Sequence, residues 1–366
     1  MKKIYFLFLA IIIASGCSSI MMKKVKLVEG PKIAAYWTSP KIAKDEVDSL
    51  ATFHLLIVDM ENLINNPENL RAIKKKNPRI KILAYSNPME LFWPSQDSRP
   101  LQKEILEEVK TSNKWWLLQP DGESVIFWPG MRMLNLSLAC PENNGERYNQ
   151  FIAKFLLRKV LSDPIWDGYF MDNSGGDISW IGIHGINKGI DADNDGEKDD
   201  NEVLDSSWSG GIREFLQIIR ETKGENFIMV GNKGTLEFLD VLVGKMFEEF
   251  PNSYLGKVDT VRTAKDPDGW HQSITNYLET GSFSIVQAKQ IANTPAHRLF
   301  ILASALLGDG YYAYGQNLAR RFPEYRDIGQ ALSPAEEMLD GSWQREFSKA
   351  TVKVWPKEKK GEIIYK

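Results

Sequence analysis

Two acidic residues, each placed directly after an apolar run, are the side chains in this sequence best suited to do chemistry. Asp172 ends the run 166–171, which starts after the turn signal Asp163-Pro164 and has the pattern of a short buried strand. Glu248 ends a second such run, 244–247. Two carboxyl groups that flank a glycosidic bond can hydrolyse it, one by protonating the leaving oxygen and one by attacking or by activating water. The sequence therefore offers a candidate carboxylate pair.

Each carboxylate also has a structural interpretation. Asp172 precedes the turn-forming residues 173–176, and an aspartate at a strand end commonly caps such a turn. Glu248 is followed by Glu249, and the two also fit a solvated acidic turn. Because side chains alternate along a strand, only one of the two glutamates is expected to face a common cavity, and we select Glu248. Glu249 is the alternative to Glu248, and the sequence leaves open which carboxyl group is the acid, because that depends on burial and neighbours. Our first assignment makes Asp172 the nucleophile or base and Glu248 the proton donor.

The densest group of possible metal ligands lies in residues 191–202, DADNDGEKDDNE. This segment matches the calcium-loop spacing D-x-[DN]-x-[DN]-G-x5-E at every required position. Alternate carboxylates of such a loop converge on one cation, and a single backbone carbonyl adds to them. The predicted ligands of a structural Ca2+ are Asp191, Asp193, Asp195, Glu197 through its carbonyl, Asp199 and Glu202. Lys198 at the eighth position argues against a paired EF-hand, and the simpler alternative is a solvated acidic turn.

Other metal or cofactor chemistry finds little support in the sequence. The chain has 4 His, and they do not stand at ligand spacing from one another, which disfavours a catalytic transition metal. No Gly-rich phosphate loop follows the first predicted strand, so a dinucleotide site is not expected. We expect no organic cofactor.

A further set of polar and aromatic residues falls at predicted strand ends or in loops beside them. Amides and carboxylates there can bind sugar hydroxyls, and aromatic rings can stack against the faces of sugar rings. The alternative for any one of them is a role in a turn or in packing. The substrate-binding candidates are Trp37, Asp59, Tyr85, Asn87, Asn135, Asn173, Asn232, Gln287 and Asp309.

The elements that would position these residues alternate between strand-like and helix-like patterns. Eight such units favour an α/β fold of the (β/α)8 TIM barrel type over an open sheet. In that fold the chemistry lies at the carboxyl ends of the strands, where Asp172 and Glu248 are found. The predicted strands cover residues 32–36, 54–58, 80–85, 166–171, 227–230, 241–247, 283–286 and 309–315.

Three segments depart from the simple alternation. Residues 102–137 predict a hairpin-like excursion over the mouth of the barrel, and residues 174–208 predict an insertion after strand 4 that carries the calcium loop. Residues 350–365 have the pattern of a terminal hairpin. We expect the barrel to cover residues 31–340 and a small C-terminal β-hairpin extension to cover residues 341–366.

The amino terminus has the pattern of a signal peptide over residues 1–16. Two lysines precede the apolar run 4–14, which is too short for a mature transmembrane helix. The run leads into Ala14-Ser15-Gly16-Cys17, which resembles the lipobox of bacterial lipoproteins. This resemblance implies cleavage before Cys17 and lipidation of its thiol, with residues 17–30 as anchor and linker. In bacterial lipoproteins an Asp after the cysteine is the signal for retention in the inner membrane. Ser18 stands at that position here, so the resemblance implies the outer membrane or the cell surface as the location. The alternative is a plain secreted protein.

Composition narrows the function further. A chain of 366 residues can form one large barrel, which we expect to be a monomer, and its net charge of -3 argues against a nucleic-acid partner. The 11 Trp offer flat apolar faces of the kind that stack on sugars, although Trp also fills cores. After lipidation of Cys17, Cys140 is the one cysteine left, and we expect it to be a buried apolar residue.

Several of these segments together resemble a known family. The set 167–173, 231–232 and 244–248, with 128–130 and 135–137 before it, is similar to the barrel glycosidase-like proteins of hypothetical glycosyl hydrolase family 15. These are distant relatives of the endo-α-1,4-polygalactosaminidases, and the likeness covers most of residues 30–350. It implies a carboxylate pair at Asp172 and Glu248 and supplies no substrate.

The sequence thus predicts a surface-anchored glycoside hydrolase that acts on an extracellular polysaccharide or oligosaccharide. One alternative is a carbohydrate-binding lipoprotein on the same barrel, without hydrolysis. Another is a structural protein of the cell envelope. The distance between the carboxyl groups of Asp172 and Glu248 separates these possibilities best.

Overall fold

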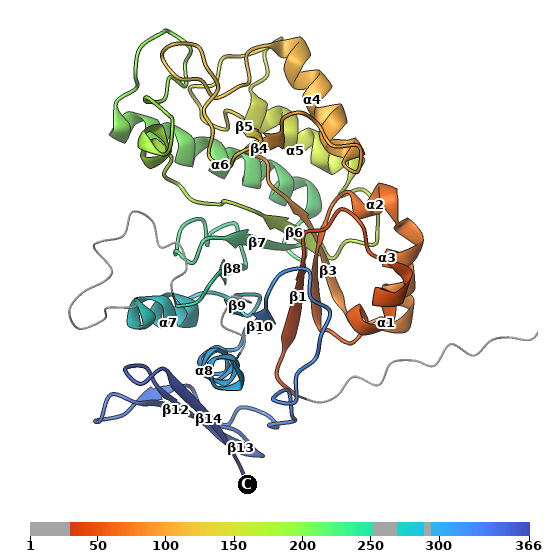
Figure 1. The fold of residues 1–366 in the computed structure, drawn as a ribbon, viewed down its shortest axis with the longest axis vertical. Coiled ribbons are helices and arrows are strands. Elements are labelled where there is room, and N and C mark those ends of the chain that lie inside the picture. Colours follow the sequence, from red (N-terminus) through yellow and green to blue (C-terminus); the bar gives the residue numbers. More distant parts are fainter. Residues whose placement is uncertain (1–29, 252–268, 289–293) are drawn as a thin grey trace, which may run out of the picture.

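A computed structural model of the chain describes residues 30–251, 269–288 and 294–366 (Figure 1). Eight parallel strands form a closed barrel in the order β1-β10-β9-β8-β7-β6-β3-β2, which confirms the predicted (β/α)8 barrel. The predicted signal peptide and Cys17 lie outside the described residues. The strands are β1 Ile33–Trp37, β2 Leu55–Asp59, β3 Lys81–Ser86, β6 Gly168–Met171, β7 Ile228–Asn232, β8 Gly244–Phe247, β9 Ile285–Ala288 and β10 Tyr311–Tyr314.

The barrel interior is filled by every second side chain of the strands. Tyr36, Leu83, Phe170, Val230 and Met246 belong to this inner core, and their chain neighbours pack outward against the helices. Period-two alternation is the expected geometry of a strand that is buried on both faces. The same alternation predicts which side chains just beyond the strand ends point inward, namely those two positions after an interior residue.

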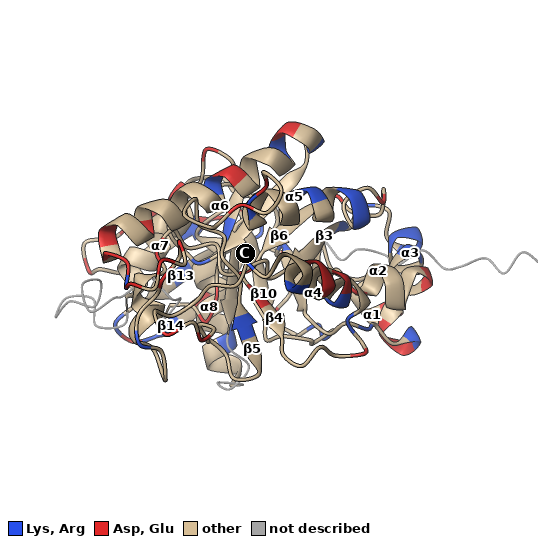
Figure 2. Ribbon diagram, turned by 90° about the horizontal axis from the view of Figure 1, so that it is seen from above, with Lys and Arg blue, Asp and Glu red and all other residues tan. Residues whose placement is uncertain are grey.

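Helices surround the barrel, and basic and acidic residues are interspersed on outer ones such as α4 and α6 (Figure 2). None of the helices in the described residues is long and apolar enough to span a bilayer. Residues 235–240, between β7 and β8, form turns and no helix, because Phe238 there has a left-handed φ of 61°. The helices are α1 Val47–Leu50, α2 Asn62–Asn65, α3 Pro67–Lys76, α4 Pro100–Ser112, α5 Tyr148–Lys159, α6 Asn201–Lys223, α7 Trp270–Glu279 and α8 Pro295–Leu306, with 3-10 turns η1 Lys44–Glu46 and η2 Ser179–Ile183.

The excursion between β3 and β6 contains two short antiparallel strands, β4 Glu90–Phe92 and β5 Met131–Met133, together with α4. Its residues 115–135 are joined to the insertion after β6. Asp191 donates its backbone N–H to the carbonyl of Leu118 at 2.9 Å, and Asn135 Nδ2 donates to the carbonyl of Ala192 at 2.6 Å. Excursion and insertion therefore form one layer, which lies beyond the barrel strands in Figure 1.

Helix α6 begins earlier than the sequence pattern indicates. The predicted insertion 174–208 would place the helix start near Ile212, but α6 runs from Asn201 because the Asp200 carboxylate caps its first turn. Gly210 and Gly211 do not mark a helix boundary. They lie within α6, where the lack of a side chain lets the helix pack closely against the excursion. A Cβ on Gly211 would lie 1.8 Å from the carbonyl oxygen of Leu136. The acidic loop consequently leads directly into α6.

The C-terminal extension is larger than the predicted hairpin. It is a four-stranded antiparallel sheet of β11 Glu336–Glu337, β12 Trp343–Glu346, β13 Ala350–Trp355 and β14 Lys360–Tyr365. Its buried residues Val352 and Val354 face α8, at the end of the molecule remote from α4 in Figure 1. The sequence predicted β13 and β14, whereas the very short β11 and the polar β12 carry little strand signal.

Candidate active site

The inward alternation of four strands brings four polar side chains to the same end of the barrel. Tyr85, Asp172, Asn232 and Glu248 each lie two residues beyond an interior residue, namely Leu83, Phe170, Val230 and Met246. Parallel strands place their carboxyl ends on one face of the barrel, so these four side chains converge there.

Asn232 connects the two acidic residues directly. Its amide nitrogen Nδ2 donates to Asp172 Oδ1 at 2.8 Å and to Glu248 Oε2 at 2.7 Å. Its amide oxygen accepts the backbone N–H of Lys233 at 2.9 Å, which fixes the orientation of the amide. The two bond lengths set an upper limit of 5.5 Å on the separation of the bonded carboxylate oxygens, because both oxygens touch one nitrogen.

Asp172 is surrounded by hydrogen-bond donors. Besides Asn232, the backbone N–H of Asn173 donates to Oδ1 at 2.9 Å and the Tyr85 hydroxyl donates to Oδ2 at 2.5 Å. Three donors suit an ionised carboxylate, which can only accept. Asp172 is thereby held in one orientation at the end of β6.

Two buried tyrosines extend this network. Tyr36 hydrogen-bonds to Tyr85, and burial, reinforced by the negative charge of Asp172, holds the pKa of both phenols well above the ordinary value of 10.0. Both tyrosines therefore remain neutral donors at physiological pH. A chain of hydroxyl groups leads from the barrel interior to the carboxylate.

A cavity of about 460 Å³ opens at this end of the barrel, within the usual range for ligand pockets. Asp172 and Glu248 both line it, together with Asn173 and Asn232. Glu249 lines it as well, which corrects the expectation that only one glutamate faces the cavity. Strand alternation ends at Phe247, and Glu249 adopts a left-handed φ of 55° that turns its side chain to the same side.

Six of the predicted substrate-binding residues do not line the cavity. Trp37 points outward from the barrel and donates its indole N–H to the carbonyl of Lys41. Asp309 precedes β10 and so lies at the opposite end of the barrel, paired with Arg345. The prediction grouped Asp309 with residues at the mouth although it begins the predicted strand 309–315, and the structure places it before the strand entrance.

The other four form supporting contacts. Asp59 is buried in an ion pair with Arg99 at 2.6 Å, and Asn135 of the excursion bridges its neighbour Ser137 and Ala192 of the insertion. Asn87 donates to Glu90 at 2.9 Å, and Gln287 accepts the backbone N–H of Glu249 at 2.9 Å. Gln287 thus supports a residue that lines the cavity, although it does not line the cavity itself.

Sequence reasoning missed the aromatic part of the cavity lining. Phe127 and Trp128 reach it from the excursion, and Trp180 and Trp208 reach it from the insertion and from α6. Lys233, ion-paired with Asp177, and Gln316 complete its polar lining. The available signal was the presence of tryptophans in both inserted segments, which we interpreted only as a general feature of composition.

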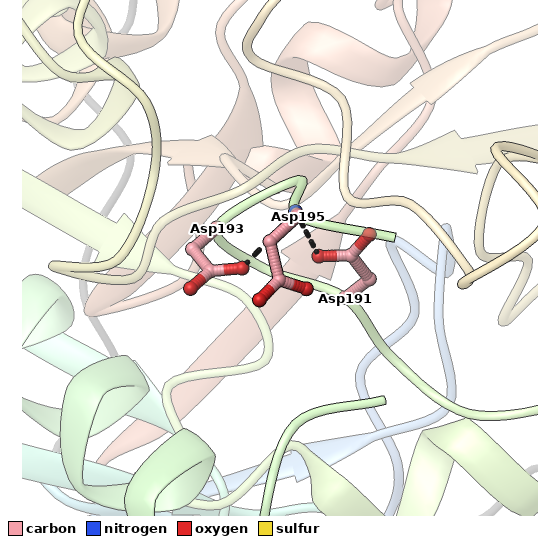
Figure 3. A group of neighbouring side chains, drawn as sticks. All are labelled: Asp191, Asp193 and Asp195. Atoms are coloured by element: carbon pink, nitrogen blue, oxygen red, sulfur yellow. Dashed lines mark hydrogen bonds between the residues drawn. The ribbon is translucent and has the colours of Figure 1, made fainter. Parts of the chain in front are cut away.

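The acidic loop of the insertion brings Asp191, Asp193 and Asp195 together (Figure 3). Carboxylate oxygens of Asp191, Asp193 and Asp195 lie within 4.8 Å of one another, so these three residues could hold a cation. Asp199 accepts the N–H of Ala192 at 2.7 Å, and burial, together with its three acidic neighbours, raises its pKa above 3.8. Glu202 lies in the first turn of α6 and falls outside the group of three.

The fold and the site together define a class of protein. A (β/α)8 barrel with two carboxylates across one cavity at the carboxyl ends of its strands is the architecture of a barrel glycosidase. The chain belongs to hypothetical glycosyl hydrolase family 15, whose model matches residues 74–351. The family places the chain among the glycoside hydrolases and confirms the resemblance seen in the sequence. No curated protein matches the chain.

Solved structures similar to this chain include three carbohydrate-active enzymes. The maltogenic α-amylase AmyB from Thermotoga neapolitana shares 8% identity at a TM-score of 0.49, covering 88% of this chain and 84% of that one. The Nostoc punctiforme debranching enzyme shares 12% identity at a TM-score of 0.44, covering 89% and 90%. The α-N-acetylgalactosaminidase NagBb from Bifidobacterium bifidum shares 8% identity at 0.46, covering 93% and 58%.

Proposed function

We propose that this protein hydrolyses glycosidic bonds of an extracellular polysaccharide or oligosaccharide, with Asp172 and Glu248 as the carboxylate pair. The observation that carries the proposal is the amide of Asn232, which donates one hydrogen bond to each carboxylate. Two carboxyl groups about 5–5.5 Å apart are the arrangement used by retaining glycosidases.

In the proposed mechanism Asp172 is the nucleophile and Glu248 the general acid. Asp172 would attack the anomeric carbon while Glu248 protonates the leaving glycosidic oxygen, which gives a covalent glycosyl ester and a free alcohol. Glu248, now ionised, would take a proton from water as that water attacks the anomeric carbon and releases Asp172. The three donors around Asp172 support its assignment as the ionised group.

The test combines a glycan screen with conservative variants of the pair. Asp172→Asn and Glu248→Gln should each lower turnover at least about a thousandfold while binding of the same glycan stays nearly intact. Asp167→Asn, at the amino end of the same strand, and Glu346→Gln, in the C-terminal sheet, are matched controls that should keep turnover. Wild-type turnover in either pair variant would refute the assignment, and binding without turnover in the wild type would leave a carbohydrate-binding protein.

We also propose that the mature protein is lipid-anchored at Cys17 outside the cytoplasm and that residues 191–202 bind a structural Ca2+. The lipobox-like Ala14-Ser15-Gly16-Cys17 supports the first, and the complete calcium-loop spacing supports the second. Labelling with a radioactive fatty acid in wild type and in Cys17→Ser tests the anchor. A signal that persists in the variant would exclude it.

A further inference from the structure

Three aromatic residues form one wall of the cavity, and we call Phe127, Trp128 and Trp180 the aromatic wall. The ring centroids of Phe127 and Trp128 lie 4.9 Å apart, and those of Phe127 and Trp180 lie 5.3 Å apart with perpendicular ring planes. All three residues line the cavity that contains Asp172 and Glu248. The wall therefore belongs to the same space as the carboxylates but comes from different segments of the chain.

Trp128 is half exposed, at 49%, although it is one of the largest apolar side chains. In contrast, Trp208 lines the same cavity at 1% exposure and is an ordinary core residue. An exposed indole beside a cavity leaves apolar area in water that folding did not bury. A ligand that covers the indole ring of Trp128 would remove its apolar surface from water, and this burial would contribute favourable free energy to binding.

The backbone that carries the wall is held firmly. Asn187 of the insertion accepts the N–H of Ile126 at 3.1 Å and donates to its carbonyl at 2.8 Å. On the other side of Phe127, the Trp128 N–H donates to the buried carboxyl of Glu90 at 3.3 Å. The rings are thus positioned before any ligand arrives, which lowers the entropic cost of binding.

The cavity as a whole has two kinds of lining. Its barrel side offers carboxylates, the Asn232 amide and tyrosine hydroxyls, whereas the wall offers ring faces and edges. A pyranose has hydroxyl groups around its edge and an apolar face of C–H groups, so it can match both kinds of lining. Lipids or aromatic peptides would leave the polar groups of the cavity unmatched.

We propose that the aromatic wall is a binding subsite for a second pyranose unit, adjacent to the unit that contacts Asp172 and Glu248. The substrate is then a saccharide of at least two units, bound through a ring face on Trp128 and Trp180. The position of this subsite next to the sugar unit at Asp172 and Glu248 rests on the proposed function. Sugar binding by the aromatic wall does not itself require turnover. The wall sets the preference for chain length, while the carboxylates carry the chemistry.

The experiment measures binding on an array of neutral, acidic and amino-sugar glycans, from monosaccharides to longer oligosaccharides. The proteins carry Asp172→Asn so that no glycan is cleaved during the measurement. Oligosaccharides should bind more tightly than the matching monosaccharide, and Trp128→Ala and Trp180→Ala should each weaken oligosaccharide binding about tenfold. Trp355→Ala, a partly exposed tryptophan of the C-terminal sheet, is the matched control and should leave binding unchanged.

Trp128→Phe should restore part of the affinity lost in Trp128→Ala, which a folding defect would not explain. The proposal is overturned if both alanine variants keep the full oligosaccharide affinity, or if the array shows no oligosaccharide binding at all. If the alanine variants lose oligosaccharide binding but the wild-type protein hydrolyses none of the bound glycans, the subsite is supported and the hydrolase function is refuted. If the wild-type protein hydrolyses the glycans but both alanine variants bind them unchanged, the hydrolase function is supported and the subsite is refuted.

Discussion

Asp172 and Glu248 each accept a hydrogen bond from a single nitrogen, Nδ2 of Asn232, at 2.8 and 2.7 Å. This relationship holds the two carboxylates at a fixed separation without a direct contact between them. It also orients both carboxyl groups toward one point, because the two N–H groups of one amide donate to them.

The separation of the pair predicts the stereochemical outcome. The bonded oxygens are at most 5.5 Å apart by the two bond lengths, which is shorter than the roughly 6.5–9.5 Å of inverting enzymes and leaves too little room for an attacking water between the carboxyl groups. The first product formed should keep the anomeric configuration of the substrate. Proton NMR of the anomeric signal during the first minutes of hydrolysis checks this. Appearance of the opposite anomer as the first product would contradict the assignment of Asp172 as nucleophile.

Loss of the bridging amide should disturb the pair without removing it. Asn232→Ala should lower kcat about a hundredfold, because a displacement of about 1 Å at the reacting groups costs that much, and should shift the pH profile of kcat. A steady-state measurement across pH gives both quantities. Asn65→Ala is the matched control, since Asn65 Nδ2 also bridges two acceptors, the carbonyls of Pro40 and Ser98 at 2.8 Å, far along the chain from the pair. Equal pH profiles in wild type and Asn232→Ala would rule out the positioning role.

Removal of calcium should destabilise the insertion. At a free Ca2+ concentration of about 100 times Kd, binding adds about 2.7 kcal/mol, so a chelator should lower the Tm by roughly 5 °C. Asp193→Ala should lower the Tm to the same extent and should no longer respond to chelator or to added Ca2+. Asp45→Ala, on the short 3-10 turn after β1, should respond as the wild type does. Differential scanning calorimetry with and without chelator measures these Tm values. A wild-type Tm that does not change with chelator would refute the calcium site.

Glu90 should make stability depend on pH. Burial raises the pKa of its carboxyl from 4.5 to about 7, so the folded chain holds this proton more tightly than the unfolded chain does. Between those two values the folded state binds more protons, and the contribution of Glu90 to the free energy of unfolding therefore falls as pH rises and is constant above about 7. Urea unfolding from pH 4 to 8 should show a smaller fall in Glu90→Gln than in the wild type. Identical pH dependence in both proteins would contradict the raised pKa.

The barrel and the location of the pair could be predicted because both follow from simple periodicity. Alternation along β6 and β8 carries Asp172 and Glu248 inward from Phe170 and Met246, and the same rule carries Asn232 inward from Val230. A short apolar run that ends in a carboxylate can be recognised in the sequence alone. What alternation does not give is the hydrogen bond between the two acids and Asn232, because that depends on the relative twist and stagger of three strands.

The failures have equally specific causes. Asp309 was misplaced because the strand and its loop were predicted as one segment, 309–315, and its first residue was grouped with residues at strand exits, whereas β10 begins only at Tyr311. Glu249 was excluded by a rule that applies within a strand and stops applying where the backbone becomes left-handed. The aromatic wall was missed because Phe127 and Trp180 meet across two insertions, and contacts between segments about 50 residues apart leave no local pattern in the sequence.

The direction in which β1 runs has a consequence for how the cavity meets its surroundings. Ile33 begins β1 at the face of the barrel opposite to the mouth, so the chain preceding residue 33 joins the molecule on that opposite face. With the proposed acyl chains on Cys17 in a bilayer, the tether would join the barrel on the face away from the mouth. A long polymer could then enter the cavity without passing the point where the tether joins the barrel.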